Sequence, residues 1–186
     1  MALKSQASRP YSHPGYIVNR YYVPATFTGA GAAAGIAANS LFAVPVFIAE
    51  AVTIHKLGAN VTTAGSAGSK FRLGLYHNSG GVPGAAVYRS GELALDAIAE
   101  VEDTVSISVA PGWYWLAIVF SASASITLHS TSAQNVGLLG QVAPGTDGNV
   151  CRVSYAYAAL PATFPAVAST DFYAVNAPLL WWRKTS

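Results

Sequence analysis

Charged residues are scarce in this 186-residue chain. Asp, Glu, Lys and Arg make up 10% of it, against about 25% in an ordinary soluble domain. Hydrophobic residues make up 52%, which is more than the interior of one domain of this size needs. Two explanations compete: a segment that spans a membrane, or a subunit whose surface is covered by neighbouring chains.

The chain also lacks a long uninterrupted apolar run. Residues 104–146 carry no charge, but Pro111-Gly112 and Pro144-Gly145 break them, as do many Ser and Thr residues. A spanning helix needs about 20 predominantly apolar residues in a row. Residues 1–16 lack the apolar centre of a secretory signal. We therefore expect no membrane span, and we favour the covered subunit.

Cysteine occurs once, and positive charge is not clustered. Cys151 excludes an intrachain disulfide, and a lone cysteine in an apolar strand is typical of a small core residue. The formal net charge is +2 and the basic residues are scattered along the chain. Nucleic-acid binding requires a clustered basic face, so no nucleic-acid partner is expected.

Catalytic and cofactor-binding motifs are missing as well. The GxSxG nucleophile elbow and the P-loop are absent. Gly29-Ala30-Gly31 with Gly35 misses the dinucleotide fingerprint by one residue and lies outside any βαβ pattern. The four histidines are too dispersed for a zinc motif: His13, His55, His77 and His129. We expect no catalytic residue, metal site or cofactor, although triads formed only in space are invisible here.

Five of the eight carboxylates fall within residues 92–103. Clustered oxygens suit a calcium ion, but the spacing does not match an EF-hand loop. The segment is therefore interpreted as a solvated loop, with metal binding left open. Its acidic members are Glu92, Asp96, Glu100, Glu102 and Asp103.

What the chain does contain is strand and turn chemistry. Residues 71–76 and 105–109 alternate between apolar and polar positions, which is typical of half-buried strands. Residues 77–84, HNSGGVPG, are dense in turn formers: Asn78 and the pair Gly80-Gly81 tolerate positive φ, and Pro83-Gly84 suits a type II turn. With eight to ten short strands and no helical periodicity, the sequence predicts an all-β fold, an antiparallel, jelly-roll-like β-sandwich.

The flanking segments are assigned less regular roles. Residues 15–24 are a candidate first strand. Residues 28–39 are small, and their glycines favour a loop over a short helix. Residues 41–48 are an apolar run in which Pro45 predicts an edge or a bulge. Further strands are predicted around residues 153–157 and 174–182.

Residues 113–120, WYWLAIVF, are apolar at every position. A strand that is apolar on both faces is covered on both faces. The core of a sandwich covers only one of them, so the other must meet a loop, an arm or a neighbouring chain. We take this strand as support for assembly.

Residues 1–15 are polar and contain two prolines, which predicts an extended N-terminal arm, followed by a single β-sandwich domain over residues 16–186. The arm is expected to bind a partner or a sister subunit. Its candidate contact residues are Arg9, Pro10, Tyr11 and His13.

Tyrosine and tryptophan are frequent, and both provide large rigid surfaces with a polar tip. On an exposed sheet face they bind protein partners or stack on sugars; the alternative is burial in the core. The candidates for oligomer or glycan contacts are Trp113, Trp115, Trp181 and Trp182.

The stretch NVTTAGSAGSKFRLGLYHNSGGVPGAAVYRSGEL (60–93), followed by VSISVAPGWYWLAIVF (105–120), resembles a module of tailed-bacteriophage structural proteins. These include tail-fibre tips, head fibres and capsid decoration proteins. The opening GYIVNRYYVP (15–24) is also similar to them. The resemblance implies a non-enzymatic virion subunit, a homo-oligomer with a trimer favoured, whose arm docks onto capsid or tail proteins.

A carbohydrate-binding module that recognises host-surface glycans is the alternative. The Pro-Gly turn at 111–112 and the aromatic strand after it also occur in such modules. The exposed aromatic rings would then serve as the sugar platform.

Overall fold

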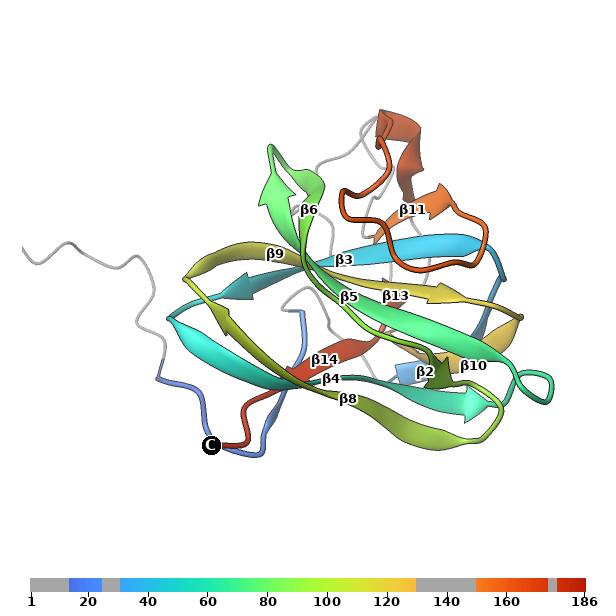
Figure 1. Ribbon diagram of the computed structural model, residues 1–186, viewed down its shortest axis with the longest axis horizontal. Coiled ribbons are helices and arrows are strands. Elements are labelled where there is room, and N and C mark those ends of the chain that lie inside the picture. The colour runs from blue at the N-terminus through green and yellow to red at the C-terminus, as the bar shows by residue number, and fades with distance from the viewer. Residues whose placement is uncertain (1–13, 25–30, 130–149, 174–176) are drawn as a thin grey trace, which may run out of the picture.

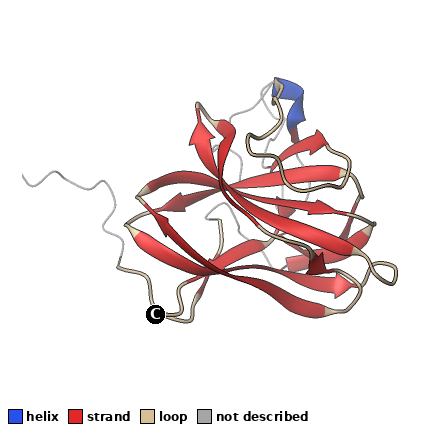
Figure 2. Ribbon diagram, viewed as in Figure 1, coloured by secondary structure: helices blue, strands red, loops and turns tan. Residues whose placement is uncertain are grey.

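The computed structural model describes residues 14–24, 31–129, 150–173 and 177–186. They contain no α-helix, only the 3-10 turn η1 (Ser169–Asp171) (Figure 2). No helix in this described part is long and apolar enough to cross a membrane. Its strands are β1 (Tyr21–Tyr22), β2 (Gly31–Ile36), β3 (Ser40–Ile48), β4 (Val52–Thr63), β5 (Lys70–Ser79), β6 (Val82–Arg89), β7 (Leu93–Ala94), β8 (Ala99–Val109), β9 (Gly112–Phe120), β10 (Ala124–His129), β11 (Val150–Ser154), β12 (Phe172–Tyr173), β13 (Ala177–Pro178) and β14 (Leu180–Arg183).

The strands form two sheets that pack face to face (Figure 1). The first sheet has the order β1-β14-β4-β10-β13, with β8 beside β4 and β2 beside β10. The second has the order β12-β11-β3-β9-β5-β6, with β7 beside β5. The strand pairs are antiparallel. The prediction of an all-β, antiparallel sandwich is confirmed.

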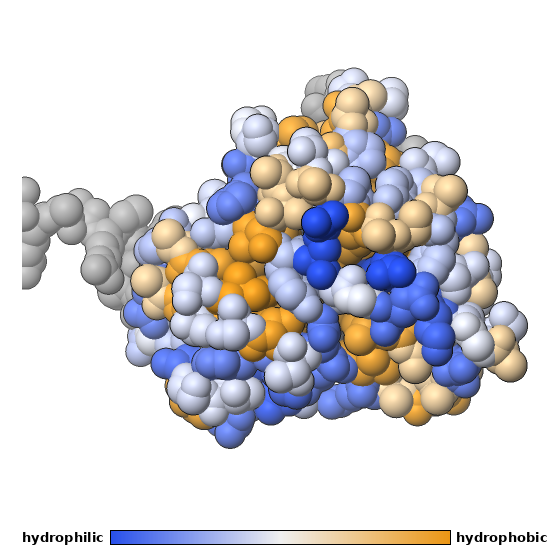
Figure 3. All heavy atoms as spheres, viewed as in Figure 1, coloured by the Kyte–Doolittle hydropathy of each residue, from blue (hydrophilic) through white to orange (hydrophobic). Residues whose placement is uncertain are grey.

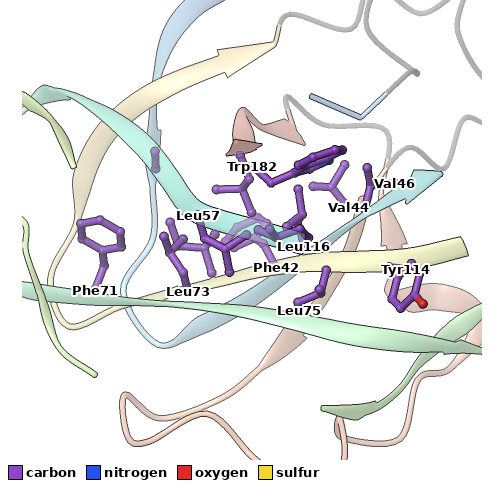
Figure 4. Close-up of a cluster of buried hydrophobic side chains, with 14 of the residues drawn as sticks. Phe42, Val44, Val46, Leu57, Phe71, Leu73, Leu75, Tyr114, Leu116 and Trp182 are labelled. Carbon is purple, nitrogen blue, oxygen red and sulfur yellow. The ribbon is translucent and has the colours of Figure 1, made fainter. Parts of the chain in front are cut away.

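The main core lies between the two sheets. Alternate residues of β5 and β9, including Leu75 and Leu116, face Leu57 and Trp182 of the opposite sheet (Figure 4). All four are at most 2% exposed. Burying a side chain of this size contributes about 1.5–3 kcal/mol, so the alternation read in the sequence is also what holds the layers together.

The outer face of β9 is buried by a second core. Trp115, Ala117 and Val119 point away from the main core, and residues 155–172 fold over them. We call residues 155–172 the cover segment; Leu160 and Phe164 are its buried anchors. A loop, an arm or a neighbouring chain was predicted to cover this face, and in the structure a loop of the same chain covers it. From Trp115 to Val119 the outer face is therefore covered within the chain, and using this part of the strand as support for a neighbouring subunit was wrong; Trp113, at the start of the strand, stays 39% exposed.

Backbone hydrogen bonds fix the cover segment to the free edge of β6. Ala86 N–H donates to the Ala162 carbonyl at 2.8 Å, and Phe164 N–H donates to the Gly84 carbonyl at 2.9 Å. The Tyr76 hydroxyl donates to the Pro161 carbonyl at 2.9 Å. Because these bonds close an edge that would otherwise be unpaired, the segment protects the sheet as well as its outer face.

The hairpin between β5 and β6 turns earlier than predicted. Gly80 and Gly81 form the two-residue turn, with φ of 62° and 92°, and Pro83 and Gly84 lie inside β6. Positive φ at both central positions defines the type I′ turn, whose twist matches that of the flanking strands. The prediction of a type II turn at Pro83-Gly84 was wrong.

Other boundaries also differ from the predictions. Residues 31–36 form strand β2 rather than a loop, because their backbone pairs with β10. Residues 99–103 belong to β8 and pair with β4, so this half of the acidic segment is not a loop. The first strand shrinks to Tyr21–Tyr22. The strand predicted over 153–157 ends at Ser154.

Pro45 lies within β3, opposite Trp115 of β9. On its other side, the pairing of β3 with β11 reaches only Ala43. Proline cannot donate to a ladder and is tolerated where the neighbouring position is unpaired. Within the described strands, Pro45 therefore sits at a local edge, as its sequence position predicted.

Candidate interaction surface at the arm-bearing end

One end of the sandwich brings together several segments that are distant in sequence. The ends of β3 and β8, the starts of β4 and β9, residues 14–18 and the C-terminal residues all lie there (Figure 1). The chain crosses between the sheets twice at this end, from β3 to β4 and from β8 to β9. We call this the arm-bearing end, because the predicted arm joins the body here.

The chain enters the body at Tyr16. Its N–H donates to Glu50 Oε1 at 3.1 Å, and its hydroxyl oxygen accepts the Ala49 N–H at 2.7 Å. The Tyr16 and Tyr22 rings pack on Trp182, with centroid distances of 4.7 and 4.6 Å. These contacts hold the base of the arm rigidly. The arm residues Arg9, Pro10, Tyr11 and His13 lie outside the described residues.

The four candidate tryptophans have different environments. Trp115 and Trp182 are 1% exposed and Trp181 is 4% exposed, so all three serve the interior. The Trp181 indole lies against Gly58, where any side chain would collide with it, and its Nε1 donates to Glu102 at 3.3 Å. Trp113 alone among the four keeps a substantial exposed surface, 39%.

Trp113 forms an exposed aromatic pair with Phe47. The two residues are cross-strand partners on β9 and β3, and their ring centroids are 5.1 Å apart. Phe47 is 42% exposed. Both lie on the outer face of the second sheet, one row beyond Trp115 and Pro45. The cover segment buries Trp115 but leaves this last row open.

Apolar residues elsewhere at this end are exposed too. Ile17 and Val18, just after the arm, are 63% and 42% exposed. Across the face in Figure 3, hydrophobic and hydrophilic residues are intermixed. Large apolar side chains are exposed elsewhere too, namely Ile98, Tyr21 and Val23. The arm-bearing end is a candidate contact surface because four such residues, Ile17, Val18, Phe47 and Trp113, lie at the end where the arm joins the body.

A polar hollow of about 440 Å³ opens at the same end, between β4, β8 and the last residues of the chain. Its polar side chains come from Thr53, His55, Ser108, Lys184 and Ser186, and its apolar lining from Ala51, Val52 and Val109. This hollow was not predicted from the sequence, because its residues converge only on folding. The one available signal was strand alternation, which places Thr53 and His55 on the outer face of β4.

The hollow contains a histidine and a serine in contact, but their arrangement does not suit nucleophilic catalysis. His55 Nδ1 accepts the Thr185 N–H at 3.1 Å. In a neutral ring the proton then resides on Nε2, which donates to Ser186 Oγ at 3.2 Å. A general base needs a lone pair at that nitrogen to take the serine proton, so this pair cannot activate the hydroxyl.

The acidic residues 92–103 are engaged separately rather than converging. Each accepts a bond from a different donor: Glu92 from Arg72, Asp96 from the Gly68 N–H, Glu100 from Tyr21, Glu102 from Arg183 and Asp103 from Tyr88. In the part of the chain that the structure describes, no three His, Cys, Asp or Glu residues are placed to hold a metal ion.

Buried hydroxyl and thiol groups predict loss of stability at alkaline pH. Partial burial, together with its hydrogen bond to Asp103, raises the pKa of Tyr88 to about 12. Burial also raises the pKa of Cys151 to about 12, helped by the charge of Asp171. The unfolded groups ionise near pKa values of about 10 and about 8.5. Each group therefore contributes its full share of the unfolding free energy below its unfolded pKa, and that contribution is lost as pH rises through about 12.

This pH dependence is measured by urea unfolding. The urea midpoint should be constant up to pH about 8 and fall steadily above it, because the unfolded chain releases these protons first. Absorbance of the tyrosinate ion should lag behind that of free tyrosine. A midpoint that rises between pH about 9 and about 11 would contradict the assignment.

No protein-family model matches the chain, and no curated protein matches it.

Proposed function

We propose that this protein is a non-enzymatic structural subunit of a tailed-bacteriophage virion. Its β-sandwich decorates the capsid or forms part of a head or tail fibre, and its N-terminal arm attaches it to other virion proteins. The working unit is a homo-oligomer, with a trimer favoured. No cofactor takes part.

The observation that supports this proposal best is the set of exposed apolar side chains at the arm-bearing end. Ile17, Val18, Phe47 and Trp113 are all more than a third exposed. Exposed aromatic residues of this kind are enriched at the centres of protein interfaces. Their position beside a firmly held arm base suits a subunit that docks through this end.

The low charge of the chain supports assembly less than the sequence alone suggested. Part of the apolar excess fills the second core under the cover segment. The proposal therefore rests on the arm, the exposed residues beside it and the resemblance of residues 60–120, and not on the outer face of β9 from Trp115 to Val119, which the cover segment buries.

Removing residues 1–13 tests the role of the arm. The truncated chain keeps Tyr16 and its bonds to Ala49 and Glu50, so its thermal midpoint should stay unchanged. Its attachment to particles that lack the protein should be abolished, as measured by co-sedimentation. A matched control replaces residues 1–13 with a Gly/Ser segment of equal length, which should also fail to attach. Full decoration by either chain would show that the arm is not the anchor.

The glycan-binding alternative now depends on one aromatic pair. Trp182 is buried, so Trp182→Ala tests folding and not sugar binding. Phe47 and Trp113 could still stack on a sugar ring. Saturable binding on a glycan array that Trp113→Ala removes, with folding retained, would favour this alternative over a purely structural role.

A further inference from the structure

We propose that residues 9–13 of the arm fold back onto the exposed Phe47–Trp113 pair of the same chain when no partner is bound. Any partner of the pair, protein or glycan, must then displace the arm. The proposal concerns the protein by itself and does not depend on the virion role. It follows from the position of the arm base, from the length and chemistry of the chain before it, and from the groups around the pair.

The arm joins the body next to the strand that carries Phe47. The Tyr16 hydroxyl and N–H are bonded to the Ala49 backbone and the Glu50 side chain, which come two and three residues after Phe47. Trp113 is the cross-strand partner of Phe47. The end of β3 and the start of β9 lie at the end of the sandwich where the arm joins (Figure 1). The base of the arm is therefore fixed beside the aromatic pair.

The chain before the body is long enough to reach the pair. Tyr11 precedes Tyr16 by five residues, a reach of up to about 17 Å in an extended chain. The two residues of strand between Phe47 and Ala49 span only about 7 Å. A segment on so short a tether has an effective concentration in the millimolar range. It therefore occupies the pair ahead of the same segment of another chain.

Residues 9–14, RPYSHP, have the chemistry that aromatic surfaces bind. The Arg9 guanidinium can lie over an indole face, and the Tyr11 ring can stack on it. Arg9 and His13 each precede a proline, which restricts them to extended conformations. Less conformational entropy is therefore lost when the segment docks, as when aromatic-lined surfaces bind proline-rich segments.

A hydrogen-bond donor is available beside the rings. Asn78 follows His77, the cross-strand partner of Tyr114, so it lies beside Trp113 on the outer face of the sheet. The Trp115 indole N–H donates to Asn78 Oδ1 at 3.0 Å, and an indole nitrogen only donates. The Nδ2–H2 group of this exposed amide is therefore left to donate elsewhere. An extended segment has backbone carbonyls without internal partners, and one of them can accept this bond.

The indole N–H signals in the NMR spectrum of the 15N-labelled full chain test the contact. Trp113 is the one tryptophan of the four with a substantially exposed ring, and Trp113→Phe assigns its signal. Deletion of residues 1–13 should shift the Trp113 signal and leave the signals of the three buried tryptophans in place. Tyr11→Ala should reproduce most of this shift. Gln6→Ala is the matched control, an arm substitution outside residues 9–13, and should leave all four signals unchanged.

A mixture separates docking within one chain from docking between chains. The 15N-labelled truncated chain is unfolded and refolded together with an excess of unlabelled full chain, and the three buried indole signals report that it has refolded. Its Trp113 signal should stay at the position of the truncated chain, because no labelled chain has an arm of its own. A shift toward the full-chain position would assign the docked arm to another copy and overturn the proposal. Identical Trp113 signals in the full and truncated chains, or equal shifts for Tyr11→Ala and Gln6→Ala, would overturn it as well.

Discussion

Replacing Trp182 with alanine should lower the free energy of unfolding by about 3–5 kcal/mol, the usual cost of truncating a buried aromatic residue. Trp182 is 1% exposed in the main core. Its ring also stacks on Tyr22 and meets the edge of Tyr16. The loss should therefore loosen the arm base as well as the core. Urea unfolding measures the first effect, and hydrogen exchange of residues 14–24 measures the second.

Trp113→Ala is the matched control for this change. It removes the same side chain from a position that is 39% exposed, so it should cost less than about 1 kcal/mol, in the range of ordinary surface substitutions. Equal destabilisation by the two variants would contradict the described packing.

The cover segment should depend on Phe164 to a similar degree. Phe164 is 4% exposed and meets the Tyr76 ring edge-on at 5.3 Å. Phe164→Ala should cost about 3–5 kcal/mol of unfolding free energy. It should also expose Cys151, which lies in the same second core. Burial raises the pKa of this thiol to about 12, and only the thiolate reacts readily.

Thiol labelling separates local opening of the cover segment from global unfolding. In the wild-type chain a disulfide reagent should label Cys151 very slowly, and in Phe164→Ala labelling should become much faster than global unfolding. Phe47→Ala is the control: it removes the same ring from an exposed position on that sheet face, and should leave labelling unchanged. Rapid labelling of the wild type would refute the buried second core.

The strands of the second sheet were predictable because their signals are local. In β5 and β9, apolar residues and Gly or Pro turns lie close together in sequence. The hairpin turns at Gly80-Gly81 rather than at Pro83-Gly84 because the type I′ turn matches the twist of the flanking strands. Gly-Gly is one of the residue pairs typical of that turn, so two turn signals competed in residues 77–84 and the prediction chose the wrong one.

Other features depend on contacts between distant residues. The small residues of β2 have weak strand propensity, and their pairing with β10 makes them a strand. Nothing periodic in residues 155–172 predicted that they would cover Trp115. Composition likewise did not distinguish the exposed Trp113 from three buried tryptophans, and the hollow joins positions as distant as Thr53, Ser108 and Lys184.

The mass of the purified full chain in solution tests most directly whether this protein works as a subunit of an assembly. Sedimentation equilibrium should give a trimer, three times the 19.2 kDa of the single chain. A single species at the mass of one chain at every concentration tested would contradict the account.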